Sequence, residues 1–186
     1  MQIREAFIED AEEACQVLRR SIVELCELDH GGNTDALDLW LSNKTPRSLR
    51  RWMTESHVFV AAEEGVILGV AAIDNSGKIT LNYVSPGARF RGVSKALIGR
   101  LEARALEFGV RTVTLESTAT ARGFYLSAGY EELGPQRLSF FGKGLCYPWR
   151  SDSPRSRRCR TKTARRSLGR PAAARHEPSA RRLRCG

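Results

Sequence analysis

Three apolar segments follow one another between His57 and Pro86, and they constrain the fold more than any other feature. Residues 57–63, 66–74 and 78–85 are rich in apolar and β-branched residues, and the turns "EEG" and "DNSG" separate them. Runs of this kind, bounded by turn residues, are typical of strands. The sequence therefore predicts a sheet in the middle of the chain, against which the other segments must pack.

Helical and further strand segments flank these three strands. In residues 9–28 the apolar residues recur at helical spacing, and the first turn is acidic, as the helix dipole favours. We expect helices over residues 9–28, 34–41, 46–53, 93–108 and 120–130, and further strands over 2–8, 110–117 and 137–141. This order predicts a mixed sheet with helices packed on it, an α/β domain.

The positive charge of the chain lies at its C-terminal end. Residues 1–145 carry 17 Lys and Arg against 19 Asp and Glu, a net charge of −2, whereas residues 146–186 carry 13 against 2, a net charge of +11. From about residue 152 the segment has no aromatic residue and no hydrophobic period, which is typical of disorder. We expect a folded domain over residues 1–150 and a basic, disordered tail over 151–186.

Two interpretations of this tail are open. Its cationic residues could bind nucleic acid or another polyanion without sequence specificity. However, 12 of its 13 cationic residues are arginine, mixed with Ser, Pro and Ala. That composition is also typical of an out-of-frame, adventitious extension encoded by GC-rich DNA.

Several protein classes are disfavoured. No apolar run approaches the roughly 20 residues of a membrane span, and "MQIREAFIEDAEEA" is unlike a secretory signal, so we expect a cytoplasmic protein without a membrane partner. The five cysteines have no C-x-x-C spacing, and we expect no metal site. Cys15 lies on the apolar stripe of the first helix and Cys26 adjoins it, so both are expected to be buried thiols.

The segment "RFRGVSKALIGRL" places charge and a glycine where a strand gives way to a helix. The first N–H groups of a helix have no intrahelical partner, and the dipole places partial positive charge there. Gly92 leaves the backbone open to a ligand, and Arg89 and Arg91 add donors. An anion site, suited to a pyrophosphate, and an ordinary solvated helix start explain this segment equally well.

Together with a later segment, this loop resembles the GCN5-related N-acetyltransferase (GNAT) family over about residues 2–145. The family's loop, Q/R-x-x-G-x-G/A, is matched by Arg89 and Gly92, with Ser94 as the small residue. The family's later motif, N-x-x-A-x-x-x-Y-x-x-x-G-F/Y, is matched at Ala121, Tyr125, Gly129 and Tyr130, with Thr118 where asparagine is usual.

This resemblance implies a mixed, mostly antiparallel sheet flanked by helices, with acetyl-CoA in a splay between the fourth and fifth strands. The backbone N–H groups of about Arg91 to Ala96 would hold the pyrophosphate, and Tyr83 and Val84 would meet the pantetheine and thioester. The expected cofactor contacts are Tyr83, Val84, Arg89, Arg91, Gly92, Val93, Ser94, Lys95, Ala96, Thr118 and Arg122. For Arg122 an exposed helix arginine is the alternative.

The implied reaction moves acetyl directly to a primary amine of a small molecule or peptide, within a ternary complex. Tyr125 matches the family's general acid for the thiolate, the alternative being an aromatic residue packed under the cofactor. The general base is open among Glu116, Asp29, His30 and a water chain, because the fourth strand, "ITLNYV", has no glutamate. For Asp29 and His30 a capped helix end with an exposed histidine is the alternative. A fold that binds CoA without turnover is an alternative function, and a homodimer is left open.

Overall fold

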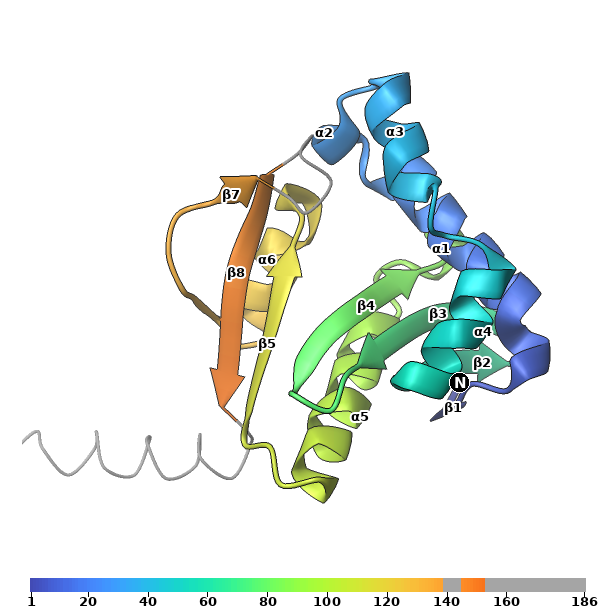
Figure 1. The fold of residues 1–186 in the computed structure, drawn as a ribbon, viewed down its shortest axis with the longest axis vertical. Helices are drawn as coiled ribbons and strands as arrows, with labels where there is room; N and C mark the ends of the chain where they lie inside the picture. The colour runs from blue at the N-terminus through green and yellow to red at the C-terminus, as the bar shows by residue number, and fades with distance from the viewer. Residues whose placement is uncertain (139–144, 153–186) are drawn as a thin grey trace, which may run out of the picture. The chain divides into compact units, whose positions relative to one another are not determined.

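The computed structural model describes residues 1–138 and 145–152, in which helices lie on both sides of a sheet (Figure 1). The helices are α1 (Ala11–Leu25), α2 (Glu27–His30), α3 (Thr34–Leu41), α4 (Pro46–Glu55), α5 (Val93–Glu107) and α6 (Ala119–Ser127), with short 3-10 helices at Ile8–Asp10 and Pro86–Ala88. The strands are β1 (Gln2–Glu5), β2 (His57–Glu63), β3 (Val66–Ile73), β4 (Lys78–Val84), β5 (Thr112–Ser117), β6 (Glu131–Glu132), β7 (Arg137–Leu138) and β8 (Leu145–Asp152).

The sheet is mixed and mostly antiparallel, as expected. Its strands follow the order β1-β2-β3-β4-β5-β8-β6, and β7 pairs with β8. Strands β1 to β4 pair antiparallel in succession, β8 pairs antiparallel with both β5 and β6, and β4 and β5 run parallel. The three central segments predicted as strands are β2, β3 and β4.

Strands β4 and β5 pair at only one end. The register joins Lys78 to Thr114 and Ile79 to Leu115, and beyond these pairs the two strands diverge (Figure 1). A bulge at Thr80 accompanies the divergence, because successive pairs of β3 face Ile79 and Leu81. A bulge turns the following side chains to the other face of a strand. Because β5 separates from β4 and the bulge reverses the side chains that follow it, β4 residues are accessible from both faces of the sheet at the split.

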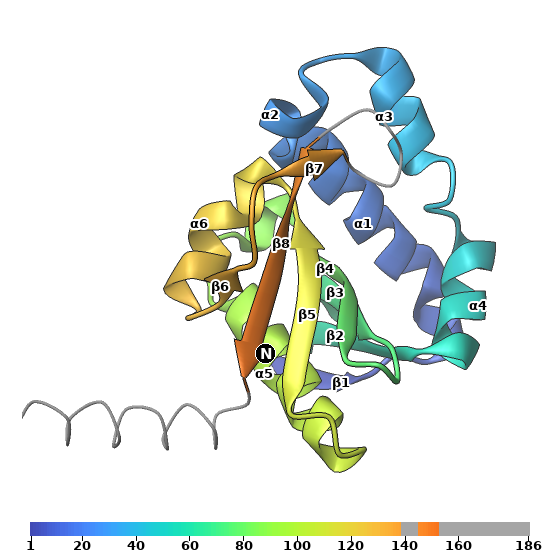
Figure 2. The same cartoon turned by 60° about the vertical axis from the view of Figure 1, so that its left-hand side comes forward.

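Two hydrophobic clusters hold the layers together, one on each face of β2 and β3. Figure 2 shows α1 and α4 on one side of these strands and α5 on the other. The α5 side buries Leu97, Leu101, Phe59, Ala71 and Ile73, and the α1 side buries Leu18, Leu49, Val58, Val60 and Val70. Cys15 and Cys26 are buried, as predicted.

The structure departs from the sequence-based prediction near both ends of the domain. The first strand ends at Glu5, and the helix expected over 9–28 divides at Cys26, where the backbone leaves the helical region (φ −105°, ψ 30°). Strand β8 is a strand that the sequence analysis missed, and it runs to Asp152, past the expected boundary at residue 150. Of the strand predicted over 137–141, residues 137 and 138 form β7. The rest of that segment, and the tail from 153, lie outside the described residues.

Candidate active site

A groove of about 610 Å³ lies beside the β4–β5 split, between the end of β4, the loop that precedes α5, the first turn of α5, and α6. We call it the α5 groove. It brings together many of the residues selected from the sequence: Tyr83, Val84, Arg89, Gly92, Val93, Ser94, Lys95, Glu116, Thr118 and Tyr125. These residues span the chain from Tyr83 to Tyr125, and the sheet order, which pairs β4 with β5, brings their segments together.

The first turn of α5 presents backbone donors to this groove. Gly92 is the N-cap and adopts a left-handed conformation (φ 78°) that glycine takes without strain. Ala96 N–H donates to Gly92 O at 3.0 Å, which closes the first turn. The N–H groups of Val93, Ser94 and Lys95 precede that bond, at the positive end of the helix dipole. The expected role of Ala96 as an anion donor is therefore not supported, because its N–H is used inside the helix.

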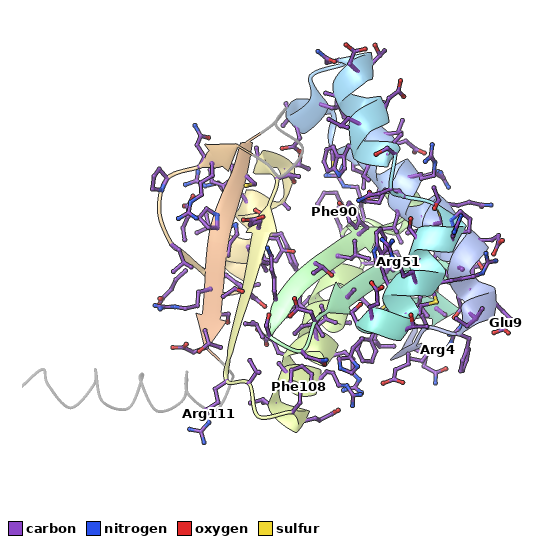
Figure 3. The ribbon with its side chains drawn as sticks, in the orientation of Figure 1. Arg4, Glu9, Arg51, Phe90, Phe108 and Arg111 are labelled. Carbon is purple, nitrogen blue, oxygen red and sulfur yellow. The ribbon has the colours of Figure 1, made fainter. Side chains whose placement is uncertain are left out.

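The loop before Gly92 is also held in an uncommon conformation. Phe90, which is labelled in Figure 3, has φ 61° although it is not glycine. The residue is 94% exposed. The guanidinium of Arg89 stacks over the Phe90 ring at 4.7 Å. Non-glycine residues in this region cost about 1–3 kcal/mol and cluster at ligand sites. Phe90 and Arg89 both line the α5 groove.

Two arginines that were expected to contact the cofactor, Arg91 and Arg122, form ion pairs at the surface instead. Arg91 forms an ion pair with Glu63, and this hydrogen bond lowers the pKa of the Glu63 carboxyl. Arg122 pairs with Glu132 at 3.0 Å and lies over the ring of Tyr147 at 5.2 Å. Neither arginine lines the α5 groove, because each is paired at the surface with a carboxylate from a neighbouring strand.

Tyr125 lies on the α6 wall of the groove and is 5% exposed. Its ring packs against Phe124, Tyr130 and Trp149. Its hydroxyl oxygen accepts a hydrogen bond from Asn82 Nδ2 at 3.1 Å. Burial raises the pKa of Tyr125 to about 12, and the Asn82 bond acts in the opposite direction. The phenol is therefore protonated at neutral pH.

On the other side of the split lies a cavity of about 550 Å³, which we call the α3–α4 cavity. Trp40 of α3 and Trp52 of α4 form part of its wall, together with Lys44 between these helices. The α5 groove and this cavity share Ile79, Thr80, Leu81, Tyr83, Glu116, Ser117 and Thr118. The two hollows thus meet where β4 and β5 diverge.

Asp29 and His30, two of the candidate bases, line the α3–α4 cavity at α2. Asp29 Oδ1 accepts from Ala119 N at 2.7 Å, at the start of α6. Gly32 N donates to His30 Nδ1 at 3.2 Å, which assigns the ring proton of neutral His30 to Nε2. His30 Nε2 and Asp29 Oδ2 are buried, with no hydrogen-bond partner among the described residues. His30 therefore faces the cavity as a donor and Asp29 as an acceptor.

Glu116, the third candidate base, lies on β5 and lines both hollows. Its side chain is 43% exposed, and its Oε2 lies 3.9 Å from Lys78 Nζ. Of the three candidates, it is the carboxylate that reaches both sides of the split. Its position opposite the bulge at Thr80 depends on the β4–β5 register and could not be read from the sequence.

Two residues of these walls were missed by the sequence analysis. Asn82 is the amide residue within "ITLNYV", and one amide in an otherwise strand-like segment is a weak signal. Lys44 stands in the polar segment "SNKTPRS", where a lysine is expected to be exposed, yet it is 5% exposed. In residues 1–138 and 145–152, no group of His, Cys, Asp and Glu could hold a metal ion. No helix in the same ranges is long and apolar enough to cross a membrane.

Residues 32–142, more than half of the chain, match a family model described as an acetyltransferase (GNAT) domain. The chain belongs to the GNAT acetyltransferase family. The matched range contains the loop before α5, the β4–β5 split and Tyr125. Among curated proteins, no relative matches the sequence.

Solved structures agree with the GNAT fold. A GCN5-related N-acetyltransferase from Rhodopseudomonas palustris has a TM-score of 0.73 and 22% identity, over 81% of this chain and 94% of that one. PaiA N-acetyltransferase from Thermoplasma acidophilum, solved in complex with coenzyme A, has a TM-score of 0.68 and 16% identity, over 81% and 98% of the two chains. YncA from Salmonella typhimurium, solved with its cofactor acetyl-CoA, has a TM-score of 0.59 and 19% identity, over 82% and 93%. The expected fold is thereby confirmed.

Proposed function

We propose that this GNAT protein is an acetyl-CoA-dependent N-acetyltransferase that acts on a primary amine. The observation that carries the proposal is the meeting of two hollows at the β4–β5 split. The α5 groove has an anion-binding helix start and a protonated phenol, and the α3–α4 cavity is open to a second ligand. A direct transfer between two bound substrates needs such a junction.

The residues of the α5 groove fit acetyl-CoA. The N–H groups of Val93, Ser94 and Lys95 would hold the pyrophosphate, and no acidic residue stands in the first turn of α5 to oppose it. The end of β4 would hold the pantetheine, where Asn82 Oδ1 is a buried acceptor without a partner among the described residues. When bound, acetyl-CoA supplies a thioester carbonyl that an amine can attack and a thiolate leaving group.

Two groups of the chain would handle the protons. Tyr125 would donate its phenolic proton to the departing thiolate sulfur as the C–S bond breaks and the C–N bond forms. Glu116, through a water molecule, would take the proton that the amine loses. His30 is disfavoured as a base because its Nε2 already carries the proton. Asp29 is disfavoured because one oxygen holds the start of α6.

The proposal includes a domain assignment. We propose that residues 1–152 form the catalytic domain, because β8 pairs with β5 through Asp152. No observation on the described residues favours nucleic-acid binding as the function.

The deciding experiment measures acetyl transfer by the full chain. Release of free CoA thiol from acetyl-CoA is followed with a panel of primary amines, next to the Tyr125→Phe variant. Amine-dependent release with a turnover number that falls roughly 10²-fold in the variant is expected. If acetyl-CoA raises the melting temperature but no amine releases CoA, the chain binds the cofactor without turnover and the proposal is wrong.

A further inference from the structure

Asp29 and His30 were selected as candidate bases, and the proposed chemistry gives neither of them a role. Both residues line the α3–α4 cavity. Asp29 Oδ2 and His30 Nε2 are buried, and neither atom has a hydrogen-bond partner among the described residues. Buried polar atoms without a partner are uncommon and costly in folded proteins. A ligand in the cavity that bonds to both atoms would remove this cost.

The carboxylate of Asp29 is held in place by a second element. Its Oδ1 accepts a hydrogen bond from Ala119 N at 2.7 Å, at the first residue of α6. This bond leaves Oδ2 as the remaining acceptor. Because one oxygen already anchors the carboxylate, a ligand would lose little further entropy in ordering the other.

The ring of His30 is held by the turn that follows α2. Gly31 ends α2 in the left-handed conformation (φ 58°), and Gly32 is left-handed as well (φ 70°). Glycine takes these angles without strain. The turn brings Gly32 N to His30 Nδ1 at 3.2 Å, so Nε2 carries the proton of the neutral ring. His30 is therefore a placed donor, next in the chain to the placed acceptor Asp29.

The other lining residues indicate what else a ligand of this cavity carries. Trp40 and Trp52 supply aromatic surface. Among the described residues, carboxylates outnumber lysines in the lining, whose charged members are Asp29, Glu55, Asp74, Glu116, Lys44 and Lys78. A cavity with an excess of negative charge favours a cation over an anion. The cavity therefore suits an amine in its cationic form, with an apolar or aromatic part.

The two buried atoms set a further requirement on the ligand. A group that satisfies both must accept a hydrogen bond from His30 and donate one to Asp29. An ammonium only donates, and a carboxylate only accepts. A hydroxyl and an amide each do both. The pair is thus matched by an uncharged group of one of these two kinds.

We propose that the acceptor of the acetyl group is an amine that also carries a hydroxyl or an amide, and that Asp29 and His30 bind this group. The inference rests on the proposed function, because it assigns the α3–α4 cavity to the acceptor. It names a class of substrate, amino alcohols and amino amides with an apolar or aromatic side group. Asp29 and His30 are then specificity-determining residues that take no part in the proton transfers.

Matched probes test this proposal on the full chain. L-phenylalaninol and phenethylamine share the ring and the primary amine, and they differ by one hydroxymethyl group. L-phenylalaninamide carries an amide at the same carbon, and L-phenylalanine a carboxylate. Binding of each probe in the presence of CoA is measured by calorimetry.

The expected result is a preference for the uncharged polar group. Hydrogen bonds to two buried partners predict that the alcohol, the amide or both bind roughly 10-fold or more tightly than phenethylamine and L-phenylalanine. The comparison of the alcohol with the amide identifies which of the two groups the pair binds. Failure of all four probes to bind would overturn the proposal. So would an affinity for phenethylamine or L-phenylalanine that equals that of the better polar probe.

Variants separate this role from a structural one. His30→Phe keeps a ring and removes the donor, so it should bring the polar probes to within about threefold of phenethylamine. His30→Gln restores an N–H donor and should restore part of the preference. Asp29→Asn keeps an oxygen for Ala119 N but replaces the free acceptor with a donor, and should lower the preference. In the control Asp38→Asn, an exposed residue of α3 that does not line the cavity, the preference should be unchanged.

A preference that persists in His30→Phe, including an equal loss of affinity for all probes, would also overturn the proposal. The rise in melting temperature with acetyl-CoA shows that each variant is folded and reports the α5 groove separately. CoA release with amines that lack a hydroxyl or amide reports turnover. A failure of the acceptor assignment is therefore distinguishable from a failure of the proposed function.

Discussion

Asn82 Nδ2 donates a hydrogen bond of 3.1 Å to the phenolic oxygen of Tyr125. A phenol that accepts from an amide directs its own proton away from that amide. Both residues line the α5 groove, so the proton of Tyr125 is free to point into it. The bond also opposes the rise in the pKa of Tyr125 that burial causes. Asn82 is thereby a positioning residue for the proposed general acid.

Replacing Asn82 with leucine should lower kcat roughly tenfold, because the phenol loses its orienting donor and its pKa rises further. Steady-state kinetics with Asn82→Leu, Tyr125→Phe and the double variant form a cycle. In the Tyr125→Phe background the Asn82 substitution should have little further effect on kcat. Independent, multiplicative losses in kcat would show that Asn82 acts otherwise than through Tyr125.

A glutamate at position 92 should abolish acetyl-CoA binding, because it places a carboxylate at the helix start that would hold the pyrophosphate. Gly109→Glu is the matched control: Gly109 follows α5, has φ 83°, and like Gly92 has open space where a Cβ would stand. Both variants bear the same kind of backbone strain. At 100 times Kd, acetyl-CoA adds about 2.7 kcal/mol to stability. The resulting shift in Tm should persist in Gly109→Glu and vanish in Gly92→Glu. If both variants lost the Tm shift, the loss in Gly92→Glu would be explained by backbone strain and not by the added carboxylate.

Trp149 of β8 should be among the most important side chains for stability. It is fully buried, and its Nε1 donates to Ser117 Oγ at 2.7 Å. Trp149→Ala should reduce the free energy of unfolding by about 3–5 kcal/mol, measured by urea denaturation. Trp149→Phe keeps most of the ring volume, loses the hydrogen bond, and should be clearly less damaging. An alanine variant as stable as the native protein would contradict the role of β8 in the core.

A chain that ends at residue 153 should keep both stability and the response to acetyl-CoA. Its last strand, β8, is complete at Asp152, where Thr112 Oγ1 hydrogen-bonds the Asp152 carboxylate at 3.1 Å. A chain that ends at residue 144 lacks β8 and should fail to fold. Circular dichroism and thermal melts of both truncations check this. Unfolding of the longer chain would refute the proposed domain assignment.

Stability should depend on pH through Lys44. Its pKa is about 8 in the folded protein and 10.5 as the ordinary value. Between these values the unfolded chain binds the proton and the folded chain does not, so the Lys44 contribution rises with pH and is lost again as the pH falls through 8. Urea denaturation at pH 7 and pH 9.5 should show the native chain gaining stability relative to Lys44→Met. An equal gain in the native chain and in Lys44→Met would contradict this role of Lys44.

The local pattern predicted the elements that form through nearby residues. The strands β2, β3 and β4 were predicted from apolar runs and turns, and α5 from its apolar stripe. The loop at Gly92 was selected from its glycine and arginines where a strand gives way to a helix, and Tyr125 was selected from a motif that resembles the one of the GNAT family. In these cases the conformation is determined by residues close together in the sequence, so each element can be predicted from its own segment.

Strand β8, the burial of Lys44 and the Asn82–Tyr125 bond depended on the tertiary structure. The segment "LCYPWRSD" contains a proline and two charged residues, and it is a strand because β5 supplies the partners for its backbone. Arg122 was a candidate for binding a CoA phosphate, but it pairs with Glu132 and does not line the α5 groove. The sequence by itself determined the family and the elements with a clear local pattern, such as β2 to β4 and α5, because these follow from motifs and periodicity. Only the tertiary structure decided that the α5 groove and the α3–α4 cavity meet. Their junction depends on the register and the bulge of β4, because pairing between distant segments sets which side chains face each other.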